Sequence, residues 1–388
     1  MMKKIAILGS TGSIGKSLLD IINKDKKNFE ILLLTADKNI KELSFQIKKF
    51  KVRNVIITNE IEFINFKKKF ANKKVNIFNN FNSFKKIFKN KNIDYAMNAI
   101  TGLDGLNPTL KIIKYTKKIA IANKESIICG WSLIKNELKK SKTEFIPIDS
   151  EHFSIWSLIE KAKDNDIEKL FITASGGPFN NYPIKKFIKI TPKLALKHPN
   201  WKMGKKITID SATMMNKVFE IIEARKIFDI EYNKLNILVH PKSYVHAIVK
   251  FKNGLTKMLI HDTNMIIPIF NSLYPNFQKT IKSDNLDFKI INNLNFNRVD
   301  IKKFPVIKIL KMLPKKNSLF ETVIVSANDK LVHLFLEGKI NFTDISKYLL
   351  RIINNKKFKK YKRITPRNIA QIEQLSNYVS LKISSLSV

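Results

Sequence analysis

The chain has 388 residues, of which 44% are hydrophobic and 10% aromatic, and its 71 Lys+Arg against 32 Asp+Glu give a formal net charge of +39. This apolar content excludes a disordered chain, and no apolar run approaches the roughly 20 residues that a membrane span requires. The single cysteine, Cys129, excludes a disulfide framework and a cysteine-based zinc site.

Strand-like runs alternate with helical segments in the first part of the chain. Residues 3–8 predict a strand, the next residues a Gly/Ser loop, and residues 13–23 a helix. Further strands are predicted at residues 30–36, 54–58, 95–99 and 119–122. This alternation predicts a parallel sheet with crossover helices.

Gly9, Gly12 and Gly15 directly follow the first predicted strand and reach into the start of the predicted helix. Glycines there allow a tight turn and bring backbone N–H groups close to a pyrophosphate at the helix N-terminus. An ordinary strand–helix turn would use the same residues, but a second strand follows at the distance that a dinucleotide site requires.

The second predicted strand ends at Asp37 and Lys38. Because an acid there favours NAD and a cation favours the 2′-phosphate of NADP, the residues alone leave both cofactors open.

Three carboxylates further along the chain could share one cation. Asp149 and Glu151 lie two residues apart, and on an extended segment their side chains point to the same face. Glu220 lies on a helix expected to start after Ser211. Three carboxylates without Cys or clustered His would select Mg²⁺ or Mn²⁺ as the bound ion. The alternative is that Asp149 and Glu151 are simply surface charges, which is the commoner role of an isolated pair of acids.

A phosphate site is predicted beside these carboxylates. Ser211 has the residue type of a helix N-cap, which would leave free N–H groups in the following turn. Asn216 and Lys217 follow on the same helix, with Asn216 four residues before Glu220. Ser175 lies in another glycine-rich turn that could add donors.

The segment from His198 to Gly204 places Trp201 and Met203 on a predicted loop. Apolar residues on a loop are typical of a lid that excludes water, and equally of loop side chains packed onto the core. We assign structural roles to the remaining candidates, which are Cys129, His240, His246, His261 and His333.

Taken in order, these motifs resemble the 1-deoxy-D-xylulose 5-phosphate reductoisomerases, a family of the non-mevalonate isoprenoid pathway. The matching segments are ILGSTGSIG (7–15), ANKES (122–126), DSEH (149–152), SGGPF (175–179), HPNWKMGKKI (198–207) and DSATMMNK (210–217). Weaker similarity extends over essentially the whole chain.

The resemblance implies an α/β protein that forms a homodimer, and a cytoplasmic location. Its parts would be a Rossmann-like NADPH-binding domain (1–149), an α/β catalytic domain with a flap (150–272), a linker (273–304) and a C-terminal helical bundle (305–388). It implies conversion of 1-deoxy-D-xylulose 5-phosphate to 2-C-methyl-D-erythritol 4-phosphate. NADPH and Mg²⁺ or Mn²⁺ would be required, with Co²⁺ as a further choice.

The resemblance also implies roles for individual residues. Lys124 would orient or protonate a substrate oxygen beside a metal, and the flap would carry Trp201 and Met203. The metal ligands would be Asp149, Glu151 and Glu220, which with Lys124 form the catalytic set. NADPH would contact Thr11, Gly12, Ser13, Ile14, Lys38, Asn39, Asn123, Glu125 and Gly204. Substrate would contact Ser150, Glu151, Ser175, His198, Ser211, Asn216, Lys217 and Glu220.

The sequence departs from the family pattern at two informative positions. Asp37 stands where the family usually has glycine, which bears on the preference for NADPH over NADH. Ile266 stands where a basic residue is usual, which bears on the dimer interface. Another NAD(P)-dependent sugar-phosphate oxidoreductase is the main alternative, and the product's carbon skeleton distinguishes the two reactions.

The charge of +39 raises a second alternative, a nucleic-acid-binding protein. Only six of the basic residues are arginine, and the lysines are spread along the chain, as codon bias in an AT-rich bacterial genome would produce. We therefore interpret the lysines as solvated faces and expect neither a nucleic-acid nor a membrane partner. Residues 351–388, with nine Lys+Arg and one acid, would be the best place for a polyanion.

Overall fold

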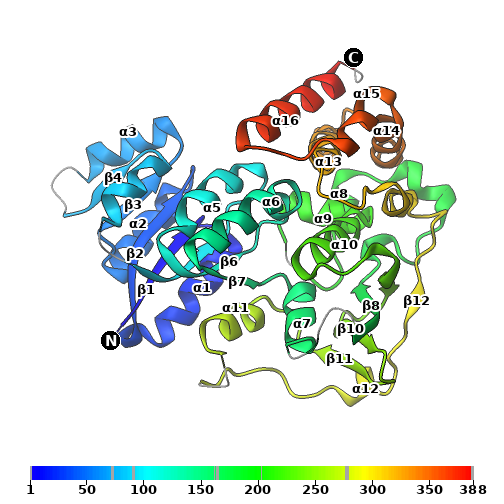
Figure 1. Ribbon diagram of the computed structural model, residues 1–388, viewed down its shortest axis with the longest axis horizontal. Helices are drawn as coiled ribbons and strands as arrows, with labels where there is room; N and C mark the ends of the chain where they lie inside the picture. Colours follow the sequence, from blue (N-terminus) through cyan, green and yellow to red (C-terminus); the bar gives the residue numbers. More distant parts are fainter. Residues whose placement is uncertain are drawn as a thin grey trace. The chain divides into compact units, whose positions relative to one another are not determined.

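The computed structural model describes residues 2–70, 74–89, 92–160, 162, 166–201, 203–275 and 279–385 (Figure 1). The chain divides into two compact units. Unit 1 comprises Met1–Ser126, Ser132–Asp149 and Met265–Ile281, and unit 2 comprises Ile127–Trp131, Ser150–Asn264 and Lys282–Val388. Among the described residues, no helix combines the length and the apolar character that crossing a membrane requires.

Unit 1 is built on a seven-stranded sheet in which every neighbouring pair is parallel. In chain order the strands are β1 (Lys3–Leu8), β2 (Phe29–Ala36), β3 (Asn54–Ile57), β4 (Asn76–Phe78), β5 (Ile93–Asn98), β6 (Thr116–Ile121) and β7 (Glu144–Pro147). The predicted strands and the predicted α/β class are confirmed. The short strands β4 and β7 lie at the two edges of the sheet and were not predicted.

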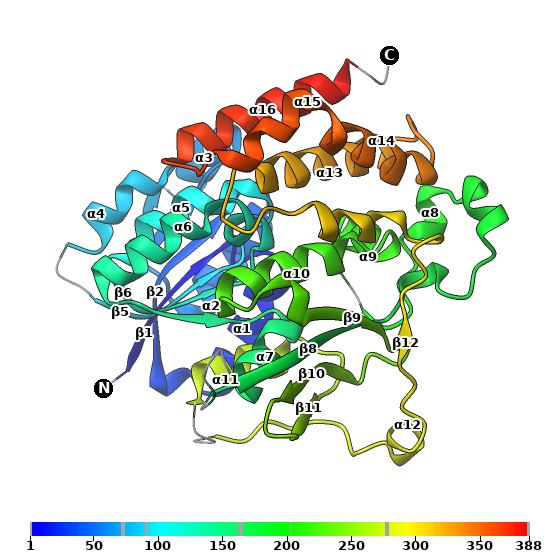
Figure 2. The same ribbon diagram turned by 45° about the vertical axis from the view of Figure 1, so that its right-hand side comes forward.

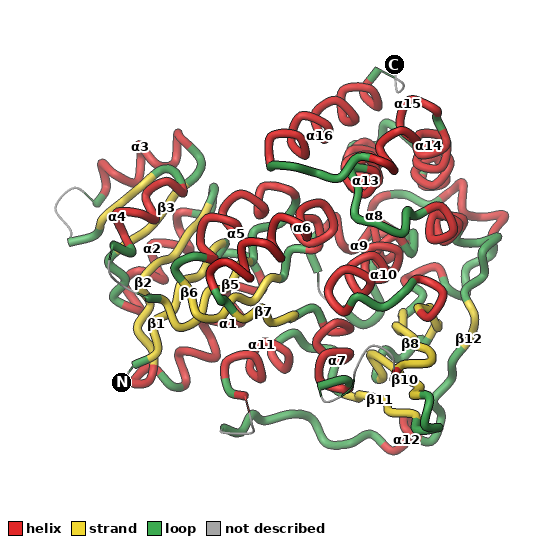
Figure 3. Tube along the Cα trace, in the orientation of Figure 1, coloured by secondary structure: helices red, strands yellow, loops and turns green. Residues whose placement is uncertain are grey.

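Helices connect these strands, as a parallel sheet requires. They are α1 (Ser13–Lys24), α2 (Ile40–Phe50), α3 (Glu60–Lys69), α4 (Phe84–Ile87), α5 (Leu106–Ile113) and α6 (Lys124–Ser141), with α11 (Ile266–Leu273) added from later in the chain. The N-termini of α2, α3 and α6 are capped by the side chains of Asn39, Asn59 and Asn123. Figure 3 shows the strands of this unit in yellow among the red helices.

The strand order β4-β3-β2-β1-β5-β6-β7 reverses direction between β1 and β5. In open parallel sheets, ligands bind outside the carboxyl ends of the strands at such a switch point. β1 runs directly into the loop of residues 9–12, and Gly15 follows in the first turn of α1. The topology therefore places that loop where a nucleotide would bind.

Unit 2 contains a five-stranded, mostly antiparallel sheet ordered β11-β10-β8-β9-β12. Its strands are β8 (Ile167–Ala174), β9 (Leu235–Val239), β10 (Val245–Phe251), β11 (Thr256–Ile260) and β12 (Asn297–Arg298). Two helices, α7 (Ser150–Leu158) and α10 (Met215–Phe228), contribute Ile155, Ile221 and Ala224 to the apolar core on this sheet.

The remaining helices of unit 2 include a C-terminal bundle. They are α8 (Pro192–Ala195), α9 (Lys205–Ala212), α12 (Phe288–Ile291), α13 (Phe320–Leu336), α14 (Phe342–Asn354), α15 (Lys356–Lys359) and α16 (Ile369–Ser384). The long helix α13 packs against both α14 and α16 (Figure 2). Its buried face carries Val323, Ala327 and Leu331, so the bundle is held by apolar burial.

Candidate active site

The glycine loop after β1 has two positions that accept no side chain. Gly9 has φ +78°, and a Cβ there would lie 2.8 Å from the carbonyl oxygen of Ala99. A Cβ on Gly15 would lie 2.6 Å from the oxygen of Gly9. Gly12 is exposed, and a Cβ there would meet only this same oxygen, at 3.5 Å. Gly9 and Gly15 therefore fix the path of the chain from β1 into α1, whereas Gly12 leaves room for a side chain.

The residues predicted to contact the nucleotide's 2′-phosphate follow β2. Lys38 is exposed and available to an anion. Asn39 also caps α2 by accepting a hydrogen bond of 3.2 Å from the Glu42 amide. Asp37, which stands where the family usually has glycine, accepts a hydrogen bond of 3.0 Å from Thr58 Oγ1.

The start of α6 organises a second group of predicted residues. Asn123 caps the helix through a 2.5 Å hydrogen bond from the Ser126 amide, and its Nδ2 donates to the oxygens of Ile100 and Gly102. Lys124, one residue into the helix, forms an ion pair with Asp149. The predicted reacting-centre lysine is thus held against a predicted metal ligand.

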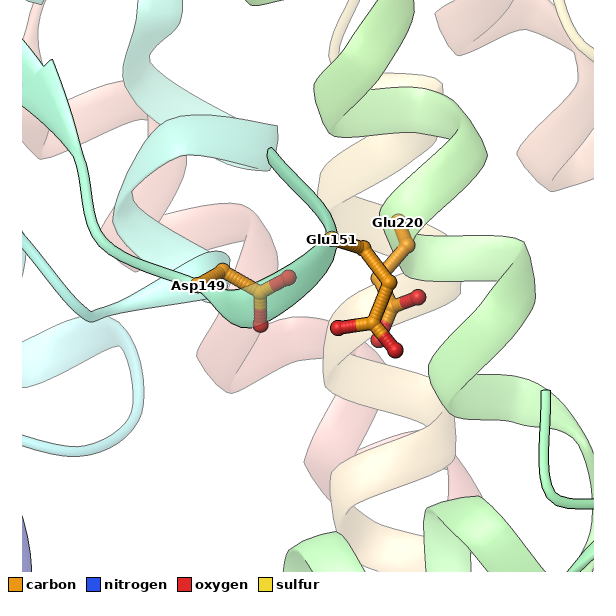
Figure 4. Close-up of side chains that lie close together, drawn as sticks. All are labelled: Asp149, Glu151 and Glu220. Atoms are coloured by element: carbon orange, nitrogen blue, oxygen red, sulfur yellow. The ribbon is translucent and has the colours of Figure 1, made fainter. Parts of the chain in front are cut away.

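The structure brings the three predicted metal ligands together. Oxygen atoms of Asp149, Glu151 and Glu220 all lie within 4.8 Å of one another (Figure 4). The expectation that Asp149 and Glu151 share a face of an extended segment is wrong. Asp149 precedes α7 and Glu151 lies in its first turn, so the start of a helix sets their spacing.

The donor set fits a hard divalent cation. With metal–oxygen bonds of about 2.1 Å, ligand oxygens around Mg²⁺ lie up to roughly 4 Å apart, so small side-chain rotations suffice. Glu151 and Glu220 are 8% and 1% exposed, and buried carboxylates require a counter-charge. Lys217 supplies it here: its Nζ lies 2.5 Å from Glu151 Oε1 and 2.6 Å from Glu220 Oε2.

Neighbouring groups hold the carboxylates in place. Ser150 Oγ donates to Glu151, and Asn216 Nδ2 donates to Glu220 Oε1 at 2.5 Å, as the i, i+4 spacing on α10 predicts. His152 Nε2 lies 2.9 Å from the backbone oxygen of Glu220. His152 is fully buried and ties α7 to α10. Sequence reasoning gave it no role, although it lies within the DSEH motif.

A second cluster of hydrogen-bonding groups lies in unit 2, around the ring of His198. His198 Nε2 lies 3.2 Å from Ser175 Oγ and 3.0 Å from Ser211 Oγ. Its Nδ1 accepts hydrogen bonds from the amides of Asn200 and Trp201, at 3.2 and 2.9 Å. The proton of the neutral ring is therefore on Nε2 and points toward the two serine hydroxyls.

The prediction that Ser211 is an N-cap is wrong. Ser211 lies inside α9, and α10 begins only at Met215 after Met214, whose φ of +66° turns the chain between the helices. The Ser211 hydroxyl nevertheless lies 3.0 Å from His198 Nε2, and the glycine turn that follows Ser175 packs on the α9 backbone at Ser211. A Cβ at Gly177 would lie 2.8 Å from the backbone oxygen of Ser211, so only glycine permits this close approach of the two backbones.

Burial sets the protonation of this cluster. It lowers the pKa of His198 to about 4, with a further contribution from the positive charge of Lys217, so the ring is neutral at pH 7. Burial alone would lower the pKa of Lys217, but Glu151 and Glu220 together raise it above its ordinary value. The cluster thus presents hydroxyls, an imidazole N–H and an ammonium, which are donors suited to an anion.

The two predicted flap residues, Trp201 and Met203, are half-buried. The indole of Trp201 meets the ring of His246 edge-on, with centroids 6.1 Å apart. His246 in turn stacks on His261, with centroids 3.7 Å apart. Burial lowers the pKa of His246 to about 3, so this imidazole is a neutral packing surface for the indole.

The fold and the carboxylate cluster define a class. A doubly wound parallel sheet with a glycine loop at its switch point is typical of dinucleotide-binding enzymes. Asp149, Glu151 and Glu220 add oxygen ligands for a divalent cation, and unit 2 adds donors for an anion. The chain therefore has the features of a metal-dependent oxidoreductase.

Comparison with known proteins identifies the family. Three sequence models match: 1-deoxy-D-xylulose 5-phosphate reductoisomerase over residues 5–130, its C-terminal domain over 145–228, and the DXP reductoisomerase C-terminal domain over 261–379. The chain is 64% identical over 388 residues to the 1-deoxy-D-xylulose 5-phosphate reductoisomerase of Pelagibacter ubique, covering 100% of both chains. It is 40% identical over 352 residues to that of Sulfurihydrogenibium, covering 91% of each. This chain belongs to the 1-deoxy-D-xylulose 5-phosphate reductoisomerase family.

Solved structures agree with this assignment. The Zymomonas mobilis reductoisomerase in complex with NADPH aligns with a TM-score of 0.88 at 30% identity, covering 100% of this chain and 99% of that one. A DOX-P reductoisomerase in complex with NADPH, fosmidomycin and magnesium aligns with a TM-score of 0.90 at 29% identity, covering 100% and 98%.

Proposed function

We propose that this chain converts 1-deoxy-D-xylulose 5-phosphate to 2-C-methyl-D-erythritol 4-phosphate, with NADPH as reductant and a divalent cation as cofactor. The observation that carries the proposal is the convergence of Asp149, Glu151 and Glu220 within 4.8 Å, with Lys217 bridging the two glutamates. When bound, the cation supplies Lewis-acid polarisation of substrate oxygens, and NADPH supplies the hydride.

The cluster formed by Ser175, His198 and Ser211 would hold the substrate's phosphate. The Nε2–H of His198 already lies within hydrogen-bonding distance of both Ser175 Oγ and Ser211 Oγ. Asn216 and Lys217 follow on α10, and their side chains now bind the carboxylates. A cation on the carboxylates would take over the neutralising role of Lys217 and release its ammonium for substrate. Binding energy from the phosphate would then orient the reacting end of the sugar.

Lys124 would act at the reacting centre. Its ammonium is held by Asp149, so it can orient a substrate oxygen or give it a proton. Ser150 positions Glu151 by hydrogen bonding. Trp201 and Met203 would cover the bound substrate and exclude water.

NADPH would bind at the switch point of unit 1. The backbone of Thr11, Gly12, Ser13 and Ile14 would meet the pyrophosphate, and Lys38 with Asn39 would meet the 2′-phosphate. Asn123, Glu125 and Gly204 would complete the contacts.

The test is NADPH oxidation with 1-deoxy-D-xylulose 5-phosphate, with and without Mg²⁺ or Mn²⁺. Glu220→Gln should abolish turnover and leave NADPH binding, measured by fluorescence, unchanged. The matched control is Glu168→Gln, which removes an exposed carboxylate paired with Lys250 and should keep full activity. Full turnover by Glu220→Gln, or in excess chelator, would overturn the metal assignment. An unbranched product by NMR would instead indicate a reductase without rearrangement.

We also propose that the chain forms a homodimer through unit 2. β11 lies at one edge of its sheet, and Leu255 beside it and Met258 within it are 57% and 48% exposed. An exposed apolar strand edge is a typical pairing surface. Analytical ultracentrifugation should show a dimer that Met258→Lys weakens, and a monomeric wild type would refute it. The division into residues 1–149, 150–272, 273–304 and 305–388 is likewise proposed. It differs from the two compact units at Met265–Ile281, which belong to unit 1, and limited proteolysis would test it.

A further inference from the structure

A hollow of about 430 Å³ on unit 2 is lined by five basic side chains. The lining residues belong to α15 and to the 3₁₀ turn Lys360–Arg363 that follows it. They are Lys356, Lys359, Lys360, Lys362 and Arg363. None of them belongs to the site described above.

One buried ring and two hydrogen bonds hold the backbone of this segment in place. Phe358 is buried, and its ring lies 6.0 Å from that of Tyr378 on α16. The Ile364 oxygen accepts a 2.7 Å hydrogen bond from the Leu319 amide. Asn355 caps α15 through the Lys357 amide, at 2.9 Å. Because the backbone is anchored on both sides of the turn, the cations are held close together on a defined surface.

The charge of this surface is not neutralised locally. Residues 345–372 contain nine Lys+Arg and no Asp or Glu. Glu321 lies in the first turn of the neighbouring helix α13, but it is buried and bound to Lys226 at 3.1 Å and to Ser318 at 2.5 Å. In the part of the chain that the structure describes, none of the five lining cations forms an ion pair. Burial and the charge of Lys359 lower the pKa of Lys362, as expected where like charges are crowded.

We propose that this hollow binds a small anion bearing two or more phosphate groups. Five cations around one concavity match several negative charges, whereas a single carboxylate would leave most of them unpaired. The volume lies in the range of small-molecule sites.

The geometry favours a small ligand over a nucleic acid. Sequence-tolerant binding of single strands uses aromatic rings on which bases stack. Lys360 Nζ lies 5.3 Å from the ring centre of Tyr361, and Lys362 Nζ lies 4.7 Å from that of Phe320, which is fully buried. None of the five lining residues is aromatic, so the lining of the hollow offers charge and no ring on which a base could stack.

Calorimetric titration with tripolyphosphate tests the proposal, using the full chain saturated with NADPH in metal-free buffer so that the nucleotide site is occupied. A triple variant, Lys359→Gln with Lys360→Gln and Arg363→Gln, removes three charges and keeps Lys362, which packs on Phe320. Its affinity for tripolyphosphate should fall at least about tenfold, since most charge-assisted contacts are lost. Turnover of the sugar phosphate should be unchanged.

The matched control replaces three exposed lysines at the end of α3, Lys67, Lys68 and Lys69, with glutamine. It makes the same change in net charge, so the effect on the general field of the protein is equal in the two triple variants. Because these three lysines do not line the hollow, the affinity for tripolyphosphate should change less than about twofold. Equal losses in both triple variants, or no binding by the wild type, would overturn the proposal. Tighter binding of a single-stranded oligonucleotide than of tripolyphosphate, lost in the first variant alone, would replace the small ligand with a polymer.

Discussion

Lys217→Gln is the substitution that most directly tests how the carboxylates of this site are balanced. The ammonium of Lys217 lies 2.5 Å from Glu151 Oε1 and 2.6 Å from Glu220 Oε2. Glutamine keeps hydrogen-bonding capacity and removes the positive charge. Two buried carboxylates are then left side by side without their shared cation.

The structure allows the cost to be estimated. The Lys217 and Glu220 side chains are 9% and 1% exposed, so little solvent screens the charge. Breaking a buried ion pair by removing one partner costs about 3 kcal/mol or more. For a unit of this size, that lowers Tm by roughly 6–12 °C. The loss should shrink toward acid pH, because repulsion raises the pKa of one carboxylate and a proton then replaces the missing charge.

Magnesium should reverse much of this loss. A divalent cation on Asp149, Glu151 and Glu220 restores the counter-charge, and ligands that bind only the folded chain stabilise it. In the wild type, Mg²⁺ must displace Lys217 from the same oxygens, so its effect on Tm should be smaller. Differential scanning fluorimetry in metal-free buffer and with added Mg²⁺ measures both shifts.

Lys226→Gln provides the matched control. Lys226 and Glu321 form another buried pair of unit 2, 3.1 Å apart and 3% and 1% exposed, outside the carboxylate cluster. In metal-free buffer, Lys226→Gln should lower Tm by a comparable amount. Because this variant keeps Lys217 and the three carboxylates, its Tm should shift with Mg²⁺ only as much as that of the wild type. An unchanged Tm for Lys217→Gln, or equal magnesium shifts in the two variants, would refute the reasoning.

Three further predictions concern other parts of the chain. Burial holds the pKa of His198 at about 4, against 6.5 ordinarily, so the stability it contributes is complete above pH 6.5 and is lost as pH falls toward 4. His198→Asn should flatten that part of the Tm–pH profile, and an unaltered profile would contradict it. Gly15→Ala would place a Cβ 2.6 Å from the Gly9 oxygen and should cost about 1–3 kcal/mol in thermal unfolding, whereas Gly12→Ala, with its nearest contact at 3.5 Å, should retain stability and weaken only NADPH binding. Lys38→Gln should raise KM for NADPH about tenfold and leave KM for NADH unchanged, since only NADPH carries the 2′-phosphate; equal effects on both would exclude that contact.

Local patterns in the sequence determine much of this protein. Alternating strands and helices predict the parallel sheet of unit 1, because apolar runs bounded by turns specify buried strands. Gly9 and Gly15 are recognisable because a tight turn with close backbone approach requires glycine. The chemical types of Asp149, Glu151 and Glu220 restrict a bound metal to a hard cation. These inferences depend on residue type and short-range spacing, which the sequence contains directly.

The tertiary structure decides how the site is assembled. Ser211 has the residue type of an N-cap but lies inside α9, because Met214 takes a left-handed turn that starts the next helix later. Glu151 meets Glu220 from 69 residues away because His152 ties α7 to the backbone of α10. The position of Lys217 between two glutamates and the low pKa of His198 both arise from burial among groups distant in the chain. Charge and burial at a point in space depend on which elements pack there, so the sequence specifies the ligands, while packing determines their distances and protonation.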